Sequence, residues 1–383
     1  MKFLEKYLLL LLLIANMTSE YILFASVSNA LFYSVFALSV IVIPQLKLLS
    51  RETRRKFPEL LTLIVIYLVA QFVFQLNMWT LENILYTVSK CMVFAILILC
   101  VNNNFNYYYR QSLNVFPYVI LFLVALGWVV NRVDSMGSIS FGFVNRNVAC
   151  TLATAGIAGF LFKNEKIKRI EFLYIAFLFA TILYGGSRNA LAMCILMFMV
   201  RYGLSSKIIF AGLIVTAAIF YVFPLFGIEV TAFDRLIGTI NGTVEIDREI
   251  PRKQAMAMIY AKPWTGWGYS YGAEAALITD INAHNGYLTT IENLGLPCGL
   301  FLLGNIIFGS LKRFKLYKLH NRLINYHLAI VVSTLFGTNQ EDYLIGVNQC
   351  TTNIFFLSFA VLGVCLYNQK YGCKNLKSQL FVK

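Results

Sequence analysis

Arg188 lies in a segment whose composition suits the binding of a phosphate group. Residues 184–190 read Tyr-Gly-Gly-Ser-Arg-Asn-Ala and interrupt a long apolar run. The paired glycines let the backbone turn tightly, and Ser187 is a favourable N-cap for a helix that begins beside it. A helix N-terminus attracts anions, and a guanidinium binds phosphate through two parallel hydrogen bonds. The segment therefore predicts a phosphate site at Arg188.

Two further arginines stand close together later in the chain. Residues 247–253 read Asp-Arg-Glu-Ile-Pro-Arg-Lys and contain Arg248 and Arg252. The Ala- and Met-rich residues 254–261 that follow are expected to form a short helix, and Pro251 suits its first turn.

Two features of this region allow more than one interpretation. Ala255, Met258 and Ile259 share one face of the expected helix, which would let it lie on a membrane surface or pack as an ordinary amphipathic helix. Residues 263–269 then read Pro-Trp-Thr-Gly-Trp-Gly-Tyr. Tryptophan and tyrosine favour the membrane–water interface, and their rings also stack on sugar faces.

His284 is the candidate for proton transfer. It stands within residues 280–287, which read Asp-Ile-Asn-Ala-His-Asn-Gly-Tyr, and Glu292 follows two turns later. Imidazole exchanges a proton near neutral pH, and Asn285 beside it can hydrogen-bond a substrate hydroxyl. A lone histidine is more often structural than catalytic. Here the polar neighbours and the position at the predicted membrane surface favour a functional role.

Apolar segments must position these residues, because little of the chain is suited to water. Of 383 residues, 59% are hydrophobic and 13% are charged, whereas soluble domains carry about 25% charged residues. Runs of about 20 apolar residues, each long enough to cross a bilayer, recur along the chain. They predict an all-α integral membrane protein, a polytopic bundle of about 12 transmembrane helices in one membrane domain, residues 1–383. The predicted spans are 7–25, 27–43, 60–77, 83–101, 115–131, 146–162, 170–185, 188–202, 208–226, 284–310, 327–345 and 350–367.

Lys and Arg residues orient this bundle. With a cytoplasmic N-terminus and alternating spans, 23 of the 32 Lys and Arg residues fall in cytoplasmic segments, as the positive-inside rule requires. Both termini are then cytoplasmic, and residues 227–283 form one large extracytoplasmic loop. Nucleic acid is not an expected partner, because the charge is divided among short separate loops. Arg146 and Arg188 lie at the outer mouths of predicted helices, where an arginine either reaches lipid headgroups or serves a functional site.

Several of these segments together resemble the O-antigen polymerase and ligase superfamily. The resemblance covers roughly residues 140–300, in the family's order. The segments that carry it are Phe143-Val144-Asn145-Arg146-Asn147, Gly186-Ser187-Arg188-Asn189-Ala190, Arg248 before Pro263-Trp264-Thr265-Gly266-Trp267-Gly268, and His284-Asn285 with Tyr287, Glu292 and Gly295.

The resemblance implies a glycosyltransferase that uses neither a metal nor another cofactor. Its donor is a glycan on undecaprenyl pyrophosphate. Arg188 and Arg248 match arginines that hold the pyrophosphate, and His284 matches a histidine near the acceptor hydroxyl, so these three are the expected catalytic residues. Arg252 stands where the family often has an aromatic residue, which leaves open whether it or Arg248 binds pyrophosphate. The expected substrate-binding residues are Arg146, Arg252, Asn285, Tyr287 and Glu292.

Within the superfamily, a Wzy-type repeat-unit polymerase of O-antigen, capsule or exopolysaccharide is the favoured function. The implied location is the cytoplasmic (inner) membrane of a bacterium. Beyond the lipid-linked glycan and the bilayer, a chain-length regulator and a flippase are expected partners. The alternatives are an O-antigen ligase that transfers the glycan to lipid A–core, a lipid-linked oligosaccharide transporter, and a membrane-bound acyltransferase, for which Asp280 would supply a carboxylate near His284.

Overall fold

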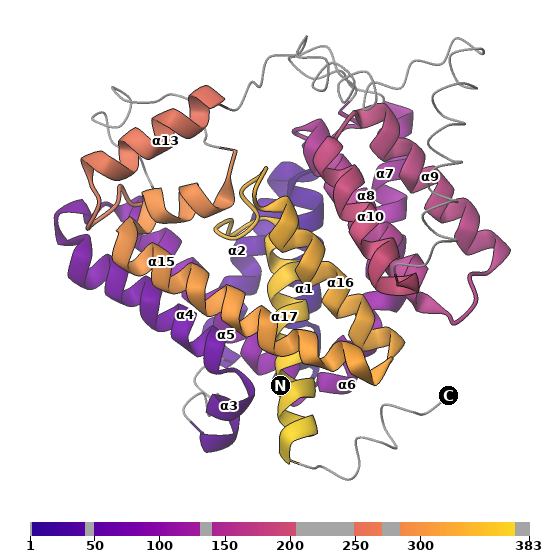
Figure 1. The fold of residues 1–383 in the computed structure, drawn as a ribbon, viewed down its shortest axis with the longest axis horizontal. Coiled ribbons are helices and arrows are strands. Elements are labelled where there is room, and N and C mark those ends of the chain that lie inside the picture. The colour runs from indigo at the N-terminus through magenta and orange to yellow at the C-terminus, as the bar shows by residue number, and fades with distance from the viewer. Residues whose placement is uncertain (1, 43–49, 131–139, 204–248, 270–283, 372–383) are drawn as a thin grey trace.

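The computed structural model describes residues 2–42, 50–130, 140–203, 249–269 and 284–371. Within these ranges the chain is almost entirely helical and has no β-strand apart from an isolated bridge between Tyr21 and Phe143. The helices, labelled as in Figure 1, are α1 (Lys2–Ser19), α2 (Ala25–Val42), α3 (Arg51–Lys56), α4 (Pro58–Val69), α5 (Leu81–Asn103), α6 (Phe105–Asn114), α7 (Phe116–Val130), α8 (Arg146–Lys163), α9 (Arg169–Gly185), α10 (Arg188–Tyr202), α13 (Glu249–Ala261), α15 (Gly286–Phe314), α16 (Arg322–Gly337) and α17 (Cys350–Tyr371).

A helix begins or runs within each predicted span that the structure describes, and one prediction needs correction. The predicted span 327–345 is too long, because α16 ends at Gly337 and a non-helical loop follows it up to α17. The polar run from Thr338 to Asp342 explains the early end, since the side chains of Asn339, Glu341 and Asp342 bond to side chains outside the helix. The predicted span 208–226 lies outside the described residues.

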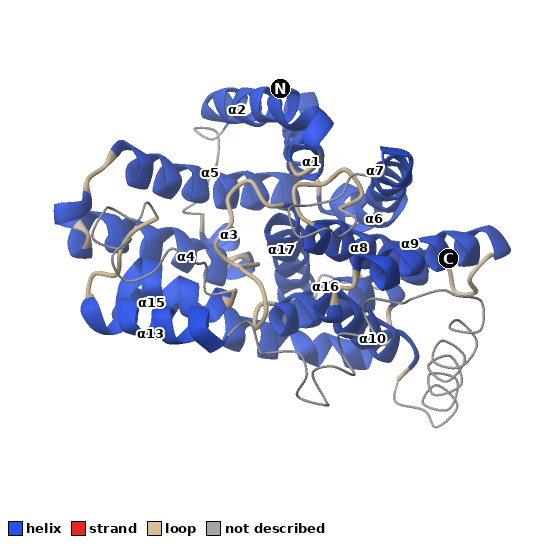
Figure 2. Cartoon of the chain, turned by 90° about the horizontal axis from the view of Figure 1, so that it is seen from above, coloured by secondary structure: helices blue, strands red, loops and turns tan. Residues whose placement is uncertain are grey.

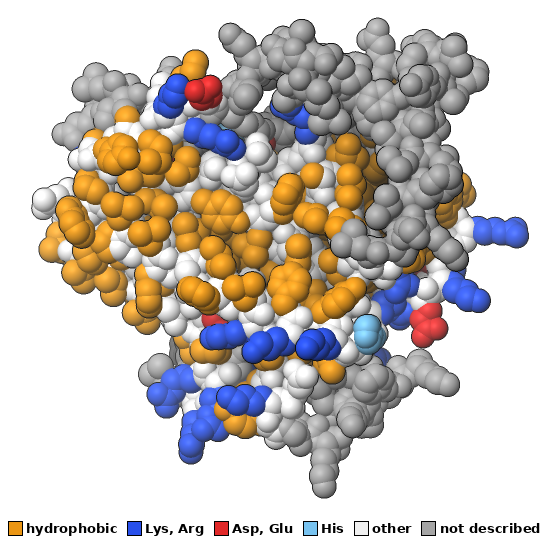
Figure 3. All heavy atoms as spheres, in the orientation of Figure 1, with side chains coloured by type: hydrophobic (Ala, Val, Ile, Leu, Met, Phe, Trp, Pro, Cys, Tyr) orange, Lys and Arg blue, Asp and Glu red, His pale blue; other side chains and the backbone are white. Residues whose placement is uncertain are grey.

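Four helical segments of the described chain are long and apolar enough to cross a membrane: Ile22–Val40, Leu81–Asn103, Gly286–Leu319 and Cys350–Tyr371. Shorter apolar helices run over Lys6–Ser19, Pro58–Phe74 and Phe116–Val130. Hydrophobic side chains cover the middle of the face drawn in Figure 3, and Lys and Arg gather along its lower edge. On α15, for example, Phe301 and Phe308 are 63% and 66% exposed, which suits a lipid environment.

Helix α17 forms the core of the bundle. Every residue from 352 to 365 is buried, and α17 contacts α1, α3, α5, α6, α8, α15 and α16. Seen from above, α4, α5 and α15 lie on one side of it and α7 to α10 on the other (Figure 2). Helices α3 and α13, which the sequence analysis puts on opposite sides of the membrane, lie at opposite ends of the protein (Figure 1).

A buried ion pair joins three helices near the end that carries α3. Arg313 of α15 is 1% exposed and lies 3.0 Å from Glu59 of α4. Its Nε donates to the carbonyl of Phe359 on α17 at 2.9 Å, and its Nη1 donates to the carbonyl of Gly309 at 2.8 Å. The guanidinium also lies 3.7 Å from the centre of the Phe359 ring. Its hydrogen bonds are therefore divided among all three helices.

Arg313→Met is expected to lower the free energy of unfolding by about 3 to 4 kcal/mol, because the Glu59 carboxylate stays buried after its main partner is lost. Denaturant unfolding in detergent, followed by tryptophan fluorescence, measures the change. Lys312→Met is the matched control: Lys312 is 61% exposed and lies 3.7 Å from Glu59, so its loss costs less than about 1 kcal/mol. Equal effects of the two variants would contradict this account of the ion pair.

Candidate active site

The loop between α16 and α17, residues 338–349, joins elements that are far apart in the sequence. Asn147, in the first turn of α8, donates from Nδ2 to Oε1 of Glu341 at 3.0 Å. Asn189, in the first turn of α10, donates to the carbonyl of Gly337 at 3.1 Å, where α16 ends. Arg252 of α13 donates to the carbonyl of Asn339 at 3.1 Å. The starts of α8 and α10 and one face of α13 therefore meet at this loop.

The start of α15 is attached to the same loop. The Asn285 side chain caps the helix, accepting from the backbone N–H groups of Tyr287 and Leu288 at 3.1 Å each, and it donates to Oδ1 of Asn339 at 3.1 Å. The backbone N–H of Gly286 donates to the carbonyl of Thr338 at 2.8 Å. Asn285 thus fixes where the helix begins and where the preceding residue, His284, is held.

His284 lies beside a carboxylate that comes from the loop. Its Nδ1 is 3.6 Å from Oε2 of Glu341, and the side chains are 39% and 15% exposed, respectively. The His284 backbone has a φ of +46°, a left-handed conformation that costs a residue with a side chain about 1 kcal/mol or more. Such strain is concentrated at functional sites. The imidazole is exposed enough to contact a substrate.

The predicted arginines occupy different environments. Arg188 is the first residue of α10 and is exposed, and Ser187 caps that helix as predicted, accepting from the N–H of Ala190 at 3.4 Å. Arg146 is the first residue of α8 and is only 8% exposed. Arg252 is partly exposed, and its Nε is buried with no hydrogen-bond partner among the described residues. The predicted catalytic residue Arg248 lies outside the described residues.

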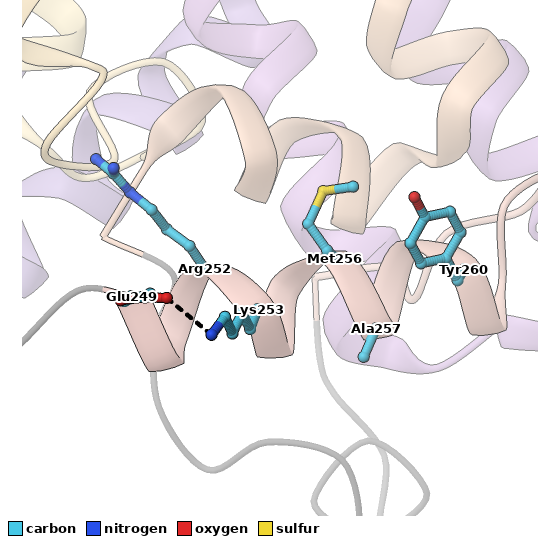
Figure 4. Close-up of a pocket in the computed structure, with 6 residues that line it drawn as sticks. All are labelled: Glu249, Arg252, Lys253, Met256, Ala257 and Tyr260. Carbon is cyan, nitrogen blue, oxygen red and sulfur yellow. Dashed lines mark ion pairs between the residues drawn. The ribbon is translucent and has the colours of Figure 1, made fainter.

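A depression of about 540 Å³ runs along α13 (Figure 4). Its lining is charged toward the start of the helix and apolar farther along: Glu249, Arg252, Lys253, Met256, Ala257 and Tyr260. Arg252 points toward the α16–α17 loop, and Lys253 pairs with Glu249 at 2.8 Å (Figure 4). This hydrogen bond holds the pKa of the Glu249 carboxyl below its ordinary value. The depression therefore offers a cationic end beside the loop and an apolar remainder.

The opposite face of α13 shows whether this helix lies on a membrane surface or packs in the protein, which the sequence left open. Ala255, Met258 and Ile259 are buried, and α13 contacts α15 (Figure 1). Their shared face therefore belongs to an ordinary packing helix. The expected helix also starts earlier than residue 254, at Glu249.

The glycine- and aromatic-rich turn after α13 docks on a break in α15. The N–H of Trp267 donates to the carbonyl of Glu292 at 2.9 Å, that of Gly268 to the carbonyl of Asn293 at 3.0 Å, and that of Leu296 to the carbonyl of Pro263 at 2.7 Å. The indole of Trp267 is 5% exposed and donates to the carbonyl of Met258 at 2.9 Å. This turn therefore joins α13 to α15. Its other aromatic side chains, Trp264 and Tyr269, are 69% and 52% exposed.

Two predicted substrate-binding residues lie deeper than the others. The hydroxyl of Tyr287 donates to the carbonyl of Leu335 on α16 at 2.6 Å. Glu292 is 4% exposed. Both belong to the packing of α15, so contact with a substrate stays a prediction for them.

None of the loop residues themselves was among the predicted site residues. Glu341, Asn339 and Asp342 were hidden inside a predicted span, although two adjacent carboxylates and two amides in an apolar run are a signal against a span. Asp342 accepts from the Thr289 hydroxyl at 2.9 Å. Burial raises the pKa of Tyr343, whose hydroxyl lies 2.7 Å from that of Thr151 on α8.

Lys90 and Tyr86 hold the far side of the loop. Lys90, fully buried on α5, donates from Nζ to the carbonyls of Gly346 and Leu344 at 2.8 and 3.3 Å. The Tyr86 hydroxyl donates to the carbonyl of Ile345 at 2.6 Å. These bonds satisfy backbone carbonyls that would otherwise be buried without donors, and they fix the loop that carries Glu341.

The arrangement combines cations with a group that can exchange a proton. Arg252 bonds to the loop, and His284 lies beside its carboxylate Glu341. Arg146 and Arg188 begin the two helices whose next residues bond to the loop or to the end of α16. Cations together with a group that exchanges a proton suit transfer of a group from a phosphate leaving group to a hydroxyl. In the described part of the chain, no set of three or more His, Cys, Asp or Glu side chains is arranged to hold a metal ion. No protein-family model matches the chain, and no curated protein matches it.

Proposed function

We propose that this protein polymerises oligosaccharide repeat units linked to undecaprenyl pyrophosphate, by inverting glycosyl transfer on the outer face of a bacterial cytoplasmic membrane. The observation that supports it most is the meeting of His284, Arg252 and the first turns of α8 and α10 around the α16–α17 loop. His284 and Arg252, which were predicted from the sequence for proton transfer and phosphate binding, contact this loop. The predicted Arg146 and Arg188 are the first residues of α8 and α10.

The depression along α13 fits the two parts of such a donor. Arg252 and Lys253 at one end suit a pyrophosphate, which would compete with Glu249 for Lys253. Met256, Ala257 and Tyr260 provide an apolar surface for the first isoprene units. In this proposal the end of the protein that carries α13 faces away from the cytoplasm, as the count of Lys and Arg residues predicts.

The proposed reaction breaks the bond between the anomeric carbon and the pyrophosphate oxygen of the growing chain. An acceptor hydroxyl on the next lipid-linked repeat unit attacks that carbon from the opposite face and forms the new glycosidic bond. His284 accepts the hydroxyl proton, and undecaprenyl pyrophosphate leaves with the bonding electrons. Arg188, Arg248 and Arg252 stabilise the charge that develops on the pyrophosphate.

A membrane-bound acyltransferase is the second candidate, because a carboxylate beside histidine also suits acyl transfer to a hydroxyl. Here Glu341 supplies that carboxylate at 3.6 Å, while Asp280 lies outside the described residues. An acyltransferase would need an acyl donor and would leave glycan chain length unchanged.

Deleting the gene in its host separates the candidates. We expect lipid-linked and surface glycans, analysed by mass spectrometry, to retain single repeat units and to lose long chains. Expression of the protein in trans should restore the long chains. Long chains stranded on undecaprenyl pyrophosphate would indicate the ligase instead. Full-length glycans lacking an ester group would indicate the acyltransferase, and an unchanged profile would contradict all three.

A further inference from the structure

We propose that Glu341 is a positioning residue that holds His284 in the tautomer and orientation needed to accept a proton from the acceptor hydroxyl. The proposal rests on the function proposed above, because it adds a residue to the same site. It assigns a role to a carboxylate that is 57 positions away from His284 in the sequence.

The geometry allows this role. Oε2 of Glu341 lies 3.6 Å from Nδ1 of His284, a distance that small side-chain movements on substrate binding would close to a direct hydrogen bond. Oε1 accepts from the Asn147 amide at 3.0 Å, so one oxygen is fixed and the other is directed at the imidazole. The carboxylate is also less exposed than the ring, at 15% against 39%.

A carboxylate next to one ring nitrogen determines what the other nitrogen does. Once that gap closes, Glu341 accepts a hydrogen bond from Nδ1–H, so the neutral ring keeps its proton there and leaves Nε2 unprotonated. When Nε2 takes the hydroxyl proton, the imidazolium is stabilised by the adjacent negative charge. Glu341 itself touches neither substrate nor the reacting atoms.

The loop is held firmly enough for this purpose. Lys90 and Tyr86 bind its far side, and Asn285 binds Asn339. The other charged groups on the elements packed here include Asp342, which accepts from Thr289, and the arginines Arg146, Arg188 and Arg252. They also include the paired Glu249 and Lys253 on α13, the buried Glu292 on α15, and Lys90 on α5. Glu341 is the carboxylate within ion-pair distance of the described imidazole.

Nitrogen NMR of the histidine side chains tests the pairing without any activity assay. The chain has three histidines, so ¹⁵N-histidine-labelled protein in lipid nanodiscs gives few signals, and His284→Ala identifies one set. We expect His284 to carry its neutral proton on Nδ1. In Glu341→Gln the midpoint of its titration should move to lower pH by about one unit, because the stabilising charge is lost.

Asp342→Asn is the matched control, since it removes the same charge from the neighbouring residue. Its carboxylate pairs with Thr289, so the His284 signals and titration should change far less than in Glu341→Gln. Equal effects of the two variants, or a His284 titration unchanged in Glu341→Gln, would overturn the pairing.

Polymerisation of lipid-linked repeat units, extracted from a host that lacks this gene, measures the consequence. Glu341→Gln should lower kcat about 100-fold with little change in KM, move the rising limb of the pH–rate profile to lower pH, and cause no further loss in a His284→Ala background. Glu341→Asp should recover part of the rate. A lower kcat with an unmoved pH limb would mean a purely structural role and would overturn the inference. Normal polymerisation by His284→Ala alone would instead overturn the proposed function, whatever the NMR result.

Discussion

Replacing His284 by alanine is expected to lower the rate of polymer formation by about 1,000-fold. A positioned general base contributes about 100- to 10,000-fold to a rate, and alanine removes the proton acceptor without disturbing Asn285, which caps α15. The substitution also removes few packing contacts, because the imidazole is partly exposed. Polymer length and yield from purified protein, with lipid-linked repeat units as substrate, measure the loss.

His320→Asn is the matched control for His284→Ala. His320 is exposed, follows the 3₁₀ turn Lys315–Leu319, and also has a positive φ, of +48°, which asparagine tolerates. We expect this variant to polymerise at the wild-type rate. If His284→Ala matches it in rate while inserting normally, His284 takes no part in the chemistry and the assignment of the site fails.

Local signals explain which parts of the site the sequence could predict. The start of α10 at Arg188 follows from a glycine pair and a serine cap, both of which act within a few residues. The predicted span that opens at His284 starts two residues early, because Asn285 caps α15, which begins at Gly286. Signals of this kind act between neighbouring residues, so they can be found in the sequence alone.

The parts that could not be predicted depend on contacts between distant segments. Glu341 acquires its place from Asn147 and from the loop bonds of Lys90 and Tyr86, which lie far away in the sequence. Apolar residues on both sides of the polar run from Thr338 to Asp342 favour one continuous span until these partners are known. The packing of α13 on α15 was likewise undecided, because the same apolar face fits a membrane surface and another helix.

Gly295→Ala is expected to destabilise the protein by roughly 5 kcal/mol and to abolish polymer formation with it. Gly295 breaks α15 with a φ of +75° and a ψ of 165°, a conformation that is essentially restricted to glycine and costs an alanine about 1 to 3 kcal/mol. A methyl group there would lie 2.7 Å from the carbonyl carbon of Trp264, so the turn after α13 must move away. Its hydrogen bonds to the break would then be lost, at roughly 1 kcal/mol or more each.

These hydrogen bonds matter because the break leaves backbone groups without helical partners. Pro297 has no N–H, so the carbonyl of Asn293 cannot accept from it; that carbonyl accepts instead from the N–H of Gly268 at 3.0 Å and from the Gln75 amide at 2.7 Å. The turn thus supplies the hydrogen bonds that the break in α15 lacks. Because it directly follows α13, it also positions that helix and its residue Arg252. Gly295 therefore connects the fold to the site, although it is buried and carries no side chain.

Gly304→Ala on the same helix separates this effect from helix propensity. A methyl group at Gly304 meets only the Phe308 ring, at 3.9 Å, and alanine favours a helix over glycine by about 1 kcal/mol. Gly304→Ala should be neutral or stabilising in denaturant unfolding, and Gly295→Ala strongly destabilising. If both variants unfold like the wild type, the turn does not depend on a left-handed residue at 295, and the coupling of α13 to α15 must arise from the buried Ala255, Met258 and Ile259 face alone.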